Sequence, residues 1–299
     1  MDYQIAVLLT CHNRCEKTVK AIKSLLEASK NFSESKLLLH FFLTDDGCTD
    51  GTSDAVRSIV GDIPLTIVRT DGDAYWAGGM RKAWDASLNT KNEFDFFLMI
   101  NDDVIFDKSA FNELFRTHFY SIDTFGMSGV YTGFIADLND NGHIIYGAKY
   151  YKKSFLSKAY DLQPTGRPQK CMLTNANLLM ISKGVFEDIG QLSIDYRHGG
   201  ADWDYGMRAH YAGFPVLTTC GVCGVGEYDH DSLDMEKLKV LHMSYRERKE
   251  FLNKPSKEYQ DAFVFLRKYN YPKYILLKMA YGLNLYFPGL YYQLLSLRP

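Results

Sequence analysis

The sequence has little net charge, only one CxxC pair of cysteines, and no internal repeat or low-complexity segment. Its 299 residues carry 34 Lys and Arg against 36 Asp and Glu, a net charge of −2, which gives no reason to expect a nucleic-acid partner. Cys220 and Cys223 lack a second CxxC pair or well-spaced histidines, which disfavours zinc and predicts buried thiols. The opening "MDYQIAVLLTCHNR" lacks the features of a secretory signal. We therefore expect a cytoplasmic protein with free cysteines.

The composition is that of a globular protein with a substantial core. Apolar residues make up 46% of the chain and charged residues 23%. A chain of this length buries roughly 75% of the surface that its unfolded form exposes. The charge is unevenly spread, because residues 231–299 hold 12 Lys and Arg against 7 Asp and Glu, a balance of +5, and residues 1–230 carry −7. The sequence thus predicts an acidic body and a basic C-terminal segment.

Apolar runs alternate with helical patterns over the first hundred residues. The runs "IAVLL", "LLLHFFLT", "LTIVR" and "FDFFLMI" are typical of buried strands. Val19, Ile22, Leu25 and Leu26 recur at helical spacing after the first run, and further helices are predicted to end at Val60 and to cover residues 78–88. Strands separated by helices of this length imply parallel pairing with helices on both faces of a sheet.

The regular alternation stops after residue 125. Strand-like pieces such as "GMSGVYTGFIA" and "HIIYGAKYY" are joined by turn signals, and a helix is predicted over residues 183–189. From Leu233 onward the pattern becomes helical and basic. This half therefore predicts a mixed α+β arrangement followed by a helical segment.

Polar clusters follow four consecutive predicted strands. They read "TCHNR", "DDGCTDG", "TDGDAYWAGG" and "NDD". In open parallel sheets, ligands bind beyond the carboxyl ends of the strands, where these loops converge. The sequence therefore predicts a polar ligand site at this edge.

The last cluster places Asn101, Asp102 and Asp103 directly after a buried run. Adjacent carboxylates repel one another unless solvent, a cation or a counter-charge offsets the repulsion. Mg²⁺ and Mn²⁺ prefer carboxylate, water and phosphate oxygens. The pattern predicts a metal ion bridging to a diphosphate, with a solvated turn as the alternative.

Six motifs follow one another between roughly residues 4 and 250. They read "VLLTCHNR", "TDDGCTDGT", "GGMRKAWDAS", "INDDV", "NANLLMISKGVFEDIGQLSIDY" and "GGADWDYGMRAHYAGF". In this order they resemble glycosyltransferase family 2, the nucleotide-sugar-dependent enzymes of the GT-A fold. The form "NDDV" and the segment "EDIGQLSIDY" are most similar to the rhamnosyl- and galactosyltransferase-like branch that builds bacterial surface polysaccharides.

The resemblance implies an α/β GT-A fold with a mostly parallel central sheet flanked by helices. It implies a catalytic domain over residues 1–230, in which 1–125 bind the nucleotide sugar and 126–230 the acceptor, and a basic, aromatic-rich helical extension over 231–299. It further implies an inverting, metal-dependent transfer from a UDP- or dTDP-sugar to a glycan acceptor in capsule, O-antigen or exopolysaccharide synthesis. The implied cofactor is Mg²⁺ or Mn²⁺.

The resemblance also assigns the donor site. Asn101, Asp102 and Asp103 match the family's "DXD" element, with Asp103 the direct metal ligand and Asn101 standing where many relatives have Asp. His230 falls where many relatives supply a late metal or phosphate ligand, with a structural histidine as the alternative. The other candidate nucleotide-sugar contacts are Thr10, His12, Asn13, Arg14, Asp45, Asp46, Gly78, Gly79 and Arg81, together with Asn101 and Asp102. For Asp46 the alternative is a plain turn with Gly47.

An inverting transfer needs a carboxylate to take the proton of the attacking hydroxyl. The family supplies it from an "ED" element, and here "GADWDYGMRA" makes Asp202 the base and puts Ala201 where Glu is frequent. Asp204 is the supporting acid, with Arg208 at i,i+4 as its expected partner. The alternative is that Asp202 is only a helix N-cap. Asn175 and Asn177 are further candidates for binding donor or acceptor hydroxyls.

The segment 271–299 is rich in tyrosine and leucine. Residues 280–297 carry no charge, but Pro288 and Gly289 interrupt this stretch, so it is at the lower limit for a spanning helix. It favours interfacial helices on the cytoplasmic face of an anionic inner membrane, with a polyprenyl-diphosphate-linked glycan as acceptor. Packing on protein is the alternative.

Two other functions remain as alternatives. A sugar nucleotidyltransferase also combines a nucleotide fold with acidic metal ligands, but it normally has a Gly-rich N-terminal loop, which "VLLTCHNRCEK" lacks. A non-catalytic sugar-nucleotide-binding or assembly protein is the other, because Asn101 and Ala201 each remove an acid that relatives often have. Retention of Asp103 and Asp202 argues against it.

Overall fold

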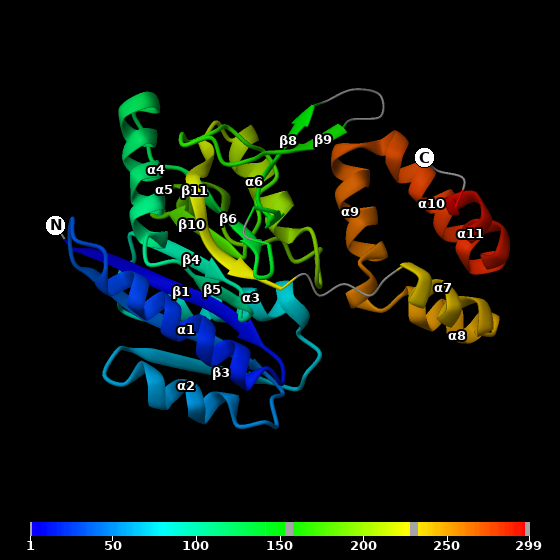
Figure 1. Ribbon diagram of the computed structural model, residues 1–299, viewed down its shortest axis with the longest axis horizontal. Helices are drawn as coiled ribbons and strands as arrows, with labels where there is room; N and C mark the ends of the chain where they lie inside the picture. The colour runs from blue at the N-terminus through cyan, green and yellow to red at the C-terminus, as the bar shows by residue number, and fades with distance from the viewer. Residues whose placement is uncertain (1, 141, 153–157, 228–232, 297–299) are drawn as a thin grey trace.

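The computed structural model describes residues 2–140, 142–152, 158–227 and 233–296. Its first half consists of β-α units, as the sequence predicts (Figure 1). The strands are β1 (Tyr3–Cys11), β2 (Leu37–Asp46), β3 (Leu65–Thr70) and β4 (Phe96–Ile100), and the helices between them are α1 (Cys15–Lys30), α2 (Thr52–Val60) and α3 (Tyr75–Leu88). These four strands pair in parallel in the order β3-β2-β1-β4.

The second half completes a mixed sheet. Strand β10 (Leu178–Ser182) runs antiparallel to β4 and to β6 (Val130–Asp137), whereas β11 (Val216–Gly226) is parallel to β6 and antiparallel to β5 (Val104–Phe106). Strand β7 (Ile144–Tyr146) pairs with β6, and β8 (Lys149–Lys152) and β9 (Lys158–Asp161) form a separate hairpin. The predicted parallel pairing thus holds for the first four strands. The predicted helix over residues 183–189 is α5 (Lys183–Ile189).

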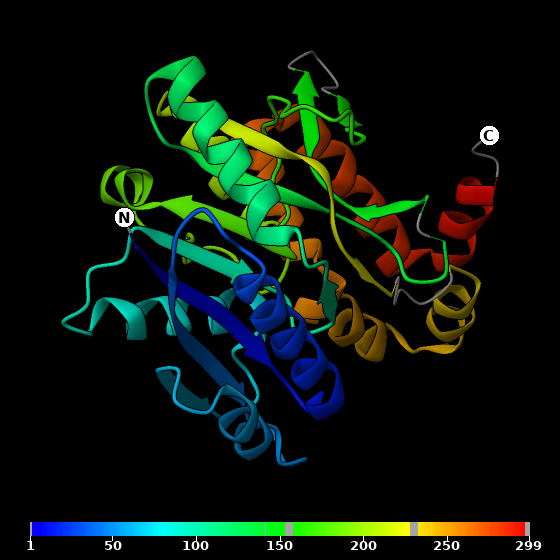
Figure 2. The same cartoon turned by 60° about the vertical axis from the view of Figure 1, so that its left-hand side comes forward.

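Helices cover both faces of the sheet. Alternate residues of β1 enter opposite cores, with Ile5 and Val7 on one face and Ala6 and Leu8 on the other, because successive strand side chains point to opposite faces. The first core includes residues of α1, α2 and α4 (Ala110–Phe125), and the second includes residues of α3, α5 and α6 (Ala201–Tyr211). Figure 2 shows α1 and α4 together on one side of the sheet.

The C-terminal segment is helical, as predicted. It comprises α7 (Leu233–His242), α8 (Tyr245–Leu252), a 3-10 turn over Pro255–Lys257, α9 (Tyr259–Tyr269), α10 (Tyr271–Tyr286) and α11 (Pro288–Ser296). Phe265 of α9 packs in the second core, and α9 lies nearest to the sheet among these helices in Figure 1. Within the described part of the chain, no helix combines the length and the apolar character that crossing a bilayer requires.

Candidate active site

The carboxyl ends of the parallel strands meet at one edge of the sheet. Cys11 at the end of β1 is level with Asp45 of β2, and Asp46 is level with Thr70 of β3. The four predicted polar loops therefore lie side by side. This edge is where α/β sheets bind ligands.

An arginine from the first loop neutralises the two adjacent acids. Arg14 donates from Nη1 to Oδ2 of Asp103 at 2.8 Å and to Oδ1 of Asp102 at 3.5 Å. Asp102 is buried, which excludes the solvated-turn alternative for it. Burial, together with the negative charge of Asp103, raises the pKa of Asp102 to about 6, and Arg14 opposes this rise. The repulsion between the acids is thus offset by a counter-charge within the chain.

The two acids have the chemistry of a partial divalent-cation site. Among the described residues, no group of three or more His, Cys, Asp or Glu side chains surrounds a common point. Mg²⁺ is usually held by one or two carboxylates and completes its coordination with substrate phosphates and water. Asp102 and Asp103 fit a cation of this kind. His230, the other predicted ligand, lies outside the described residues.

Asp45 and Asp46 are buried and hydrogen-bonded within the protein. Oδ1 of Asp46 accepts from the backbone N–H groups of Gly72 and Ala74, at 3.0 and 3.1 Å, and Oδ2 accepts from that of Tyr75 at 3.1 Å. Asp45 accepts from the N–H of Cys48 at 2.8 Å. Asp46 thus holds the loop between β3 and α3 in shape, which is more than a plain turn with Gly47 requires.

The loop after β1 is braced against its neighbours. Nδ1 of His12 lies 2.5 Å from the backbone oxygen of Asp46. Asn13 accepts from the N–H of Thr49 at 2.8 Å and adopts a φ of 51°. Such left-handed backbone is strained for a residue with a side chain and is concentrated at functional sites. The loops after β1 and β2 are therefore connected by hydrogen bonds.

The predicted glycines and arginine of α3 have three different surroundings. A Cβ at Gly79 would lie 2.2 Å from Oγ1 of Thr10, so Gly79 permits α3 to pack tightly on β1. At Gly78 the nearest atom to a Cβ would be 3.7 Å away, on Arg81, so this position is open. Arg81 donates to the backbone oxygens of Ser193 and Tyr196, at 2.9 and 2.8 Å. It thereby supports the segment before α6.

A row of side-chain amides crosses the site. Nε1 of Trp76 donates to Asn101 at 2.8 Å, Asn101 donates to Asn177 at 2.9 Å, and Asn177 donates to Asn175 at 2.6 Å. The side chains of Asn101, Asn175 and Asn177 are therefore engaged with one another. The row joins the strand-end acids to the segment that precedes β10.

Asp202 lies in the first turn of α6 and is almost fully buried. Its Oδ2 accepts from the N–H of Ala176 at 3.1 Å, and its Oδ1 accepts from that of Trp203 at 2.9 Å. Burial raises the pKa of Asp202 to about 6, and the charge of Glu258 also raises it. The N-cap of α6 is Gly200, so the alternative that Asp202 is only an N-cap is wrong. A carboxylate of this pKa is suited to general-base catalysis near neutral pH.

Asp204 is fully buried and joins α6 to α9. It accepts from Nε of Arg208 at 2.9 Å, which confirms the expected i,i+4 pair. It also accepts from Lys268 at 2.6 Å and from the hydroxyl of Tyr269 at 2.8 Å. These two partners were not predicted from the sequence, because they are more than sixty positions away from Asp204.

A second acid from α9 holds the segment before α6. Asp261 is buried and accepts from the backbone N–H groups of Arg197, His198 and Gly199, at 3.0, 2.8 and 2.9 Å. No local sequence pattern indicated this contact either. The C-terminal helices therefore form part of the wall beside Asp202.

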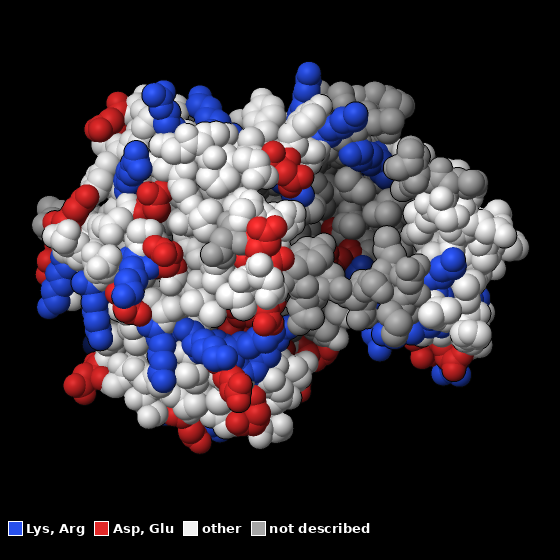
Figure 3. Space-filling view, in the orientation of Figure 1, with Lys and Arg blue, Asp and Glu red and all other residues white. Residues whose placement is uncertain are grey.

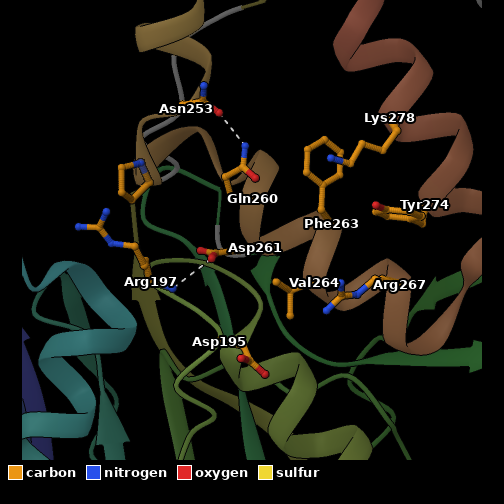
Figure 4. A pocket seen from close by; sticks show the side chains of 11 residues that line it. Asp195, Arg197, Asn253, Gln260, Asp261, Phe263, Val264, Arg267, Tyr274 and Lys278 are labelled. Atoms are coloured by element: carbon orange, nitrogen blue, oxygen red, sulfur yellow. Dashed lines mark hydrogen bonds between the residues drawn. The ribbon is translucent and has the colours of Figure 1, made fainter.

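A cavity of about 330 Å³ lies between α9, α10 and the segment 195–197. Figure 4 shows the side chains that line it. Its lining includes Phe263, Arg267 and Lys278, and the Lys278 ammonium lies 4.2 Å from the centre of the Phe263 ring. Arg197 borders this cavity and also forms a 3.1 Å ion pair with Asp73 of the loop before α3. The cavity does not include the strand-end acids.

The fold resembles that of solved nucleotide-sugar transferases. A mannosyltransferase, PcManGT of Pyrobaculum calidifontis, in complex with GDP-Man and Mn²⁺, has a TM-score of 0.54 at 14% identity over 99% of this chain and 84% of that one. TarS of S. aureus (residues 1–349), in complex with UDP-GlcNAc, has a TM-score of 0.51 at 14% identity over 86% of this chain and 66% of that one. These likenesses define a protein of the GT-A glycosyltransferase fold.

A family model then gives the sequence relationship. The chain belongs to glycosyl transferase family 2, whose model matches residues 6–172. No curated protein sequence matches it. The match and the fold together establish a glycosyltransferase, as the sequence motifs predict.

Proposed function

We propose that this glycosyltransferase is an inverting, metal-dependent enzyme that moves a sugar from a UDP- or dTDP-sugar to a glycan acceptor in bacterial surface polysaccharide synthesis. The observation that carries this proposal is the position of Asp202. Its carboxylate is held by Ala176, whose neighbour Asn177 is hydrogen-bonded to Asn101 beside the two strand-end acids. A base and an acidic diphosphate site are therefore connected through a few residues.

The reaction follows from these positions. The acceptor hydroxyl attacks the anomeric carbon and gives its proton to Asp202, while the bond between that carbon and the diphosphate oxygen breaks and the nucleoside diphosphate leaves. Asp102 and Asp103 would hold a divalent cation. When bound, that cation neutralises charge that develops on the departing diphosphate. Arg14 is placed to add positive charge at the same acids.

The donor assignment rests on the resemblance to the rhamnosyl- and galactosyltransferase-like branch. The similar structures carry different ligands, namely GDP-Man with Mn²⁺, UDP-GlcNAc, and, in GalNAc-T7, UDP with GalNAc and Mn²⁺. They support a nucleotide-sugar donor and a divalent metal. Thr10, His12, Asn13, Asp45, Asp46, Gly78 and Arg81 shape the pocket in this proposal, with residues 1–125 serving the donor and 126–230 the acceptor.

The exposed face of α10 supports peripheral contact with a membrane. Ile275, Leu276 and Met279 are 41, 53 and 67% exposed, and Tyr286 and Phe287 are exposed beyond them. At 100° per residue these side chains share one side of the helix. In the face shown in Figure 3, the surface over α10 and α11 is mainly uncharged.

Lysines border this apolar face. Lys273 and Lys278 lie on either side of it on the helix, and residues 231–299 carry a balance of +5. An apolar face flanked by cations suits the surface of an anionic bilayer. We therefore propose a cytoplasmic enzyme bound to the inner face of the membrane, with a polyprenyl-diphosphate-linked acceptor.

Calorimetric titration tests the donor site. UDP, dTDP, GDP and CMP are titrated with and without Mn²⁺ into the wild-type chain, Asp103→Ala, and the control Asp123→Ala, which removes an exposed acid of α4. We expect Mn²⁺-dependent binding of UDP or dTDP that falls at least ~10-fold in Asp103→Ala and is retained in the control. Binding of none of the four would overturn the proposal.

A further inference from the structure

Glu258, at the start of α9, has an unusual backbone conformation. Its φ is 56°, and among the described residues only Asn13 and Tyr75 share a positive φ without being glycine. Asn13 lies in the loop after β1, and Tyr75 is the first residue of α3, directly after the loop that follows β3, so both are at the strand-end site. A strained backbone of this kind is unfavourable and persists where the surrounding structure requires it. The third strained residue therefore merits a functional explanation.

The Glu258 carboxylate is directed at the segment before α6. A Cβ on Gly199 would lie 2.5 Å from Cδ of Glu258, so the carboxyl group occupies space that a side chain at residue 199 would take. Oε1 lies 3.9 Å from Nε2 of His198, and the Glu258 side chain is 56% exposed. The carboxylate thus lies next to the segment before α6 and is accessible to a ligand.

The Glu258 and His198 side chains are close enough for one oxygen atom to bridge them. Their separation of 3.9 Å is too long for a direct hydrogen bond, but an oxygen that lies to one side of the line between the two atoms can bond to both. Nδ1 of His198 is buried and has no hydrogen-bond partner among the described residues. Burial lowers the pKa of His198. A neutral ring with its proton on Nε2 is the form that leaves no unpaired N–H group buried.

The pair is electrostatically connected to both halves of the transfer site. The negative charge of Glu258 raises the pKa of Asp202, and the positive charge of Arg14 lowers the pKa of His198. The His198 ring also meets the Tyr75 ring edge-on, with centroids 6.1 Å apart. The pair is therefore close to Tyr75, at the start of α3, and near enough to Asp202 for the charge of Glu258 to affect the pKa of that base.

We propose that Glu258 and His198 form an acceptor-binding site that holds a sugar hydroxyl next to the one that reacts at Asp202. This inference rests on the proposed glycosyl transfer. The hydroxyl accepts from Nε2–H of His198 and donates to the carboxylate of Glu258, so a vicinal diol is the acceptor feature recognised. Ala201 is fully buried and contributes no polar group here, so the C-terminal extension supplies the second acid beside Asp202.

Variants at residue 258 test the site with the complete chain. Initial rates are measured with the UDP- or dTDP-sugar of the nucleotide that binds, and with a panel of 4-nitrophenyl glycosides as acceptors. Glu258→Gln removes the charge, and Glu258→Gly removes the side chain while favouring the observed φ. Glu250→Gln is the matched control, because Glu250 is an exposed acid of α8 whose ion pair is with Arg246. His198→Phe removes the ring nitrogens.

We expect both Glu258 variants to raise the acceptor KM at least ~10-fold, with a smaller change in kcat and an unchanged Kd for the nucleotide. Glu258→Gly should melt no lower than the wild type. His198→Phe should raise the acceptor KM similarly, and the double variant little further, because both groups hold one hydroxyl. An acceptor KM within twofold of the wild type in both Glu258 variants would overturn the inference while leaving the proposed function intact. Absence of nucleotide binding in the wild type would instead overturn the proposed function.

Discussion

Asn101 and Asn177 are joined by a hydrogen bond of 2.9 Å between their side-chain amides, although 76 positions separate them in the chain. Asn101 precedes the strand-end acids, and Asn177 follows Ala176, whose N–H group holds Asp202. The bond therefore connects the acidic site with the proposed base. It also gives Asn101 a role that an aspartate could not fill, because a carboxylate has no N–H group to donate.

Asp202→Asn should abolish most of the activity without loss of folding. The amide keeps the shape of the side chain but cannot accept the proton, so we expect kcat to fall roughly 10²- to 10⁴-fold. The Kd for the nucleotide should stay close to the wild-type value, as calorimetry can measure. Wild-type activity in this variant would contradict the assignment of the base.

The wild-type activity should depend on pH through Asp202. Since burial raises its pKa from 3.8 to about 6, kcat/KM should rise about tenfold per pH unit up to pH 6 and then level off. For stability, the raised pKa means that the folded state holds this proton more tightly than the unfolded state. The contribution of the Asp202 proton to the free energy of unfolding is fully present below pH 3.8 and is lost as the pH rises through about 6. Denaturant titrations should show a smaller loss in Asp202→Asn than in the wild type, because Asp102, whose pKa is also raised to about 6, titrates in both proteins.

Asp204→Asn should destabilise the protein because it leaves Arg208 and Lys268 without their shared acid. Removing one partner of a buried pair costs about 3–5 kcal/mol. Lys268 is 45% exposed, so we expect a smaller loss of roughly 2–4 kcal/mol in the free energy of unfolding. Glu250→Gln breaks an exposed pair and should cost less than about 1 kcal/mol. Equal losses in urea titrations of the two variants would refute the anchoring role of Asp204.

Gly79→Ala and Gly78→Ala should have opposite effects on stability. A methyl group at residue 79 collides with Thr10, and such overpacking costs about 1–3 kcal/mol. Residue 78 has space for the methyl group, and alanine favours a helix by up to about 1 kcal/mol over glycine. If the donor passes close to Gly78, Gly78→Ala should nevertheless weaken nucleotide-sugar binding. Melting temperatures and calorimetric Kd values measure the two effects separately.

The double variant Ile275→Glu/Met279→Glu should detach the protein from membranes. Two charges on the apolar face of α10 oppose its insertion among lipid headgroups. We expect co-sedimentation of the wild type with vesicles containing phosphatidylglycerol and recovery of the variant in the supernatant. Leu88→Glu is the matched control, because Leu88 is 43% exposed on α3, compared with 41% for Ile275. Vesicle binding by the double variant equal to that of the wild type would contradict the proposal.

Local patterns in the sequence predicted the elements well. The helix over Lys183–Ile189 has the expected bounds, and β2 extends two residues beyond the predicted run "LLLHFFLT", to Asp46, because apolar spacing and flanking glycines act within a few residues. The insertion of β10 antiparallel between β4 and β6 had no such signal. Strand order depends on contacts far apart in the sequence, and periodicity carries no information about them.

The same limit applies to the site. Arg14 was expected near phosphate, and its contact with Asp103 joins residues 89 positions apart. Arg81 was expected near the sugar diphosphate, but its Nη1 binds carbonyls of the segment before α6. The motifs located the loops correctly, whereas the partner of each side chain depends on tertiary packing. Glu258 and Asp261 carried no recognisable motif.

The three hydrogen bonds that Asp261 accepts from backbone N–H groups determine where the chain can be truncated. A chain cut before α9 would lose the acceptor of these bonds and the partners of Asp204 at the same time. The remaining part would then contain the whole family-matched region, residues 6–172, but an unsupported loop beside Asp202. Removing the apolar helix surface by substitution is therefore the better route to a soluble preparation than truncation, because it leaves α9 in place.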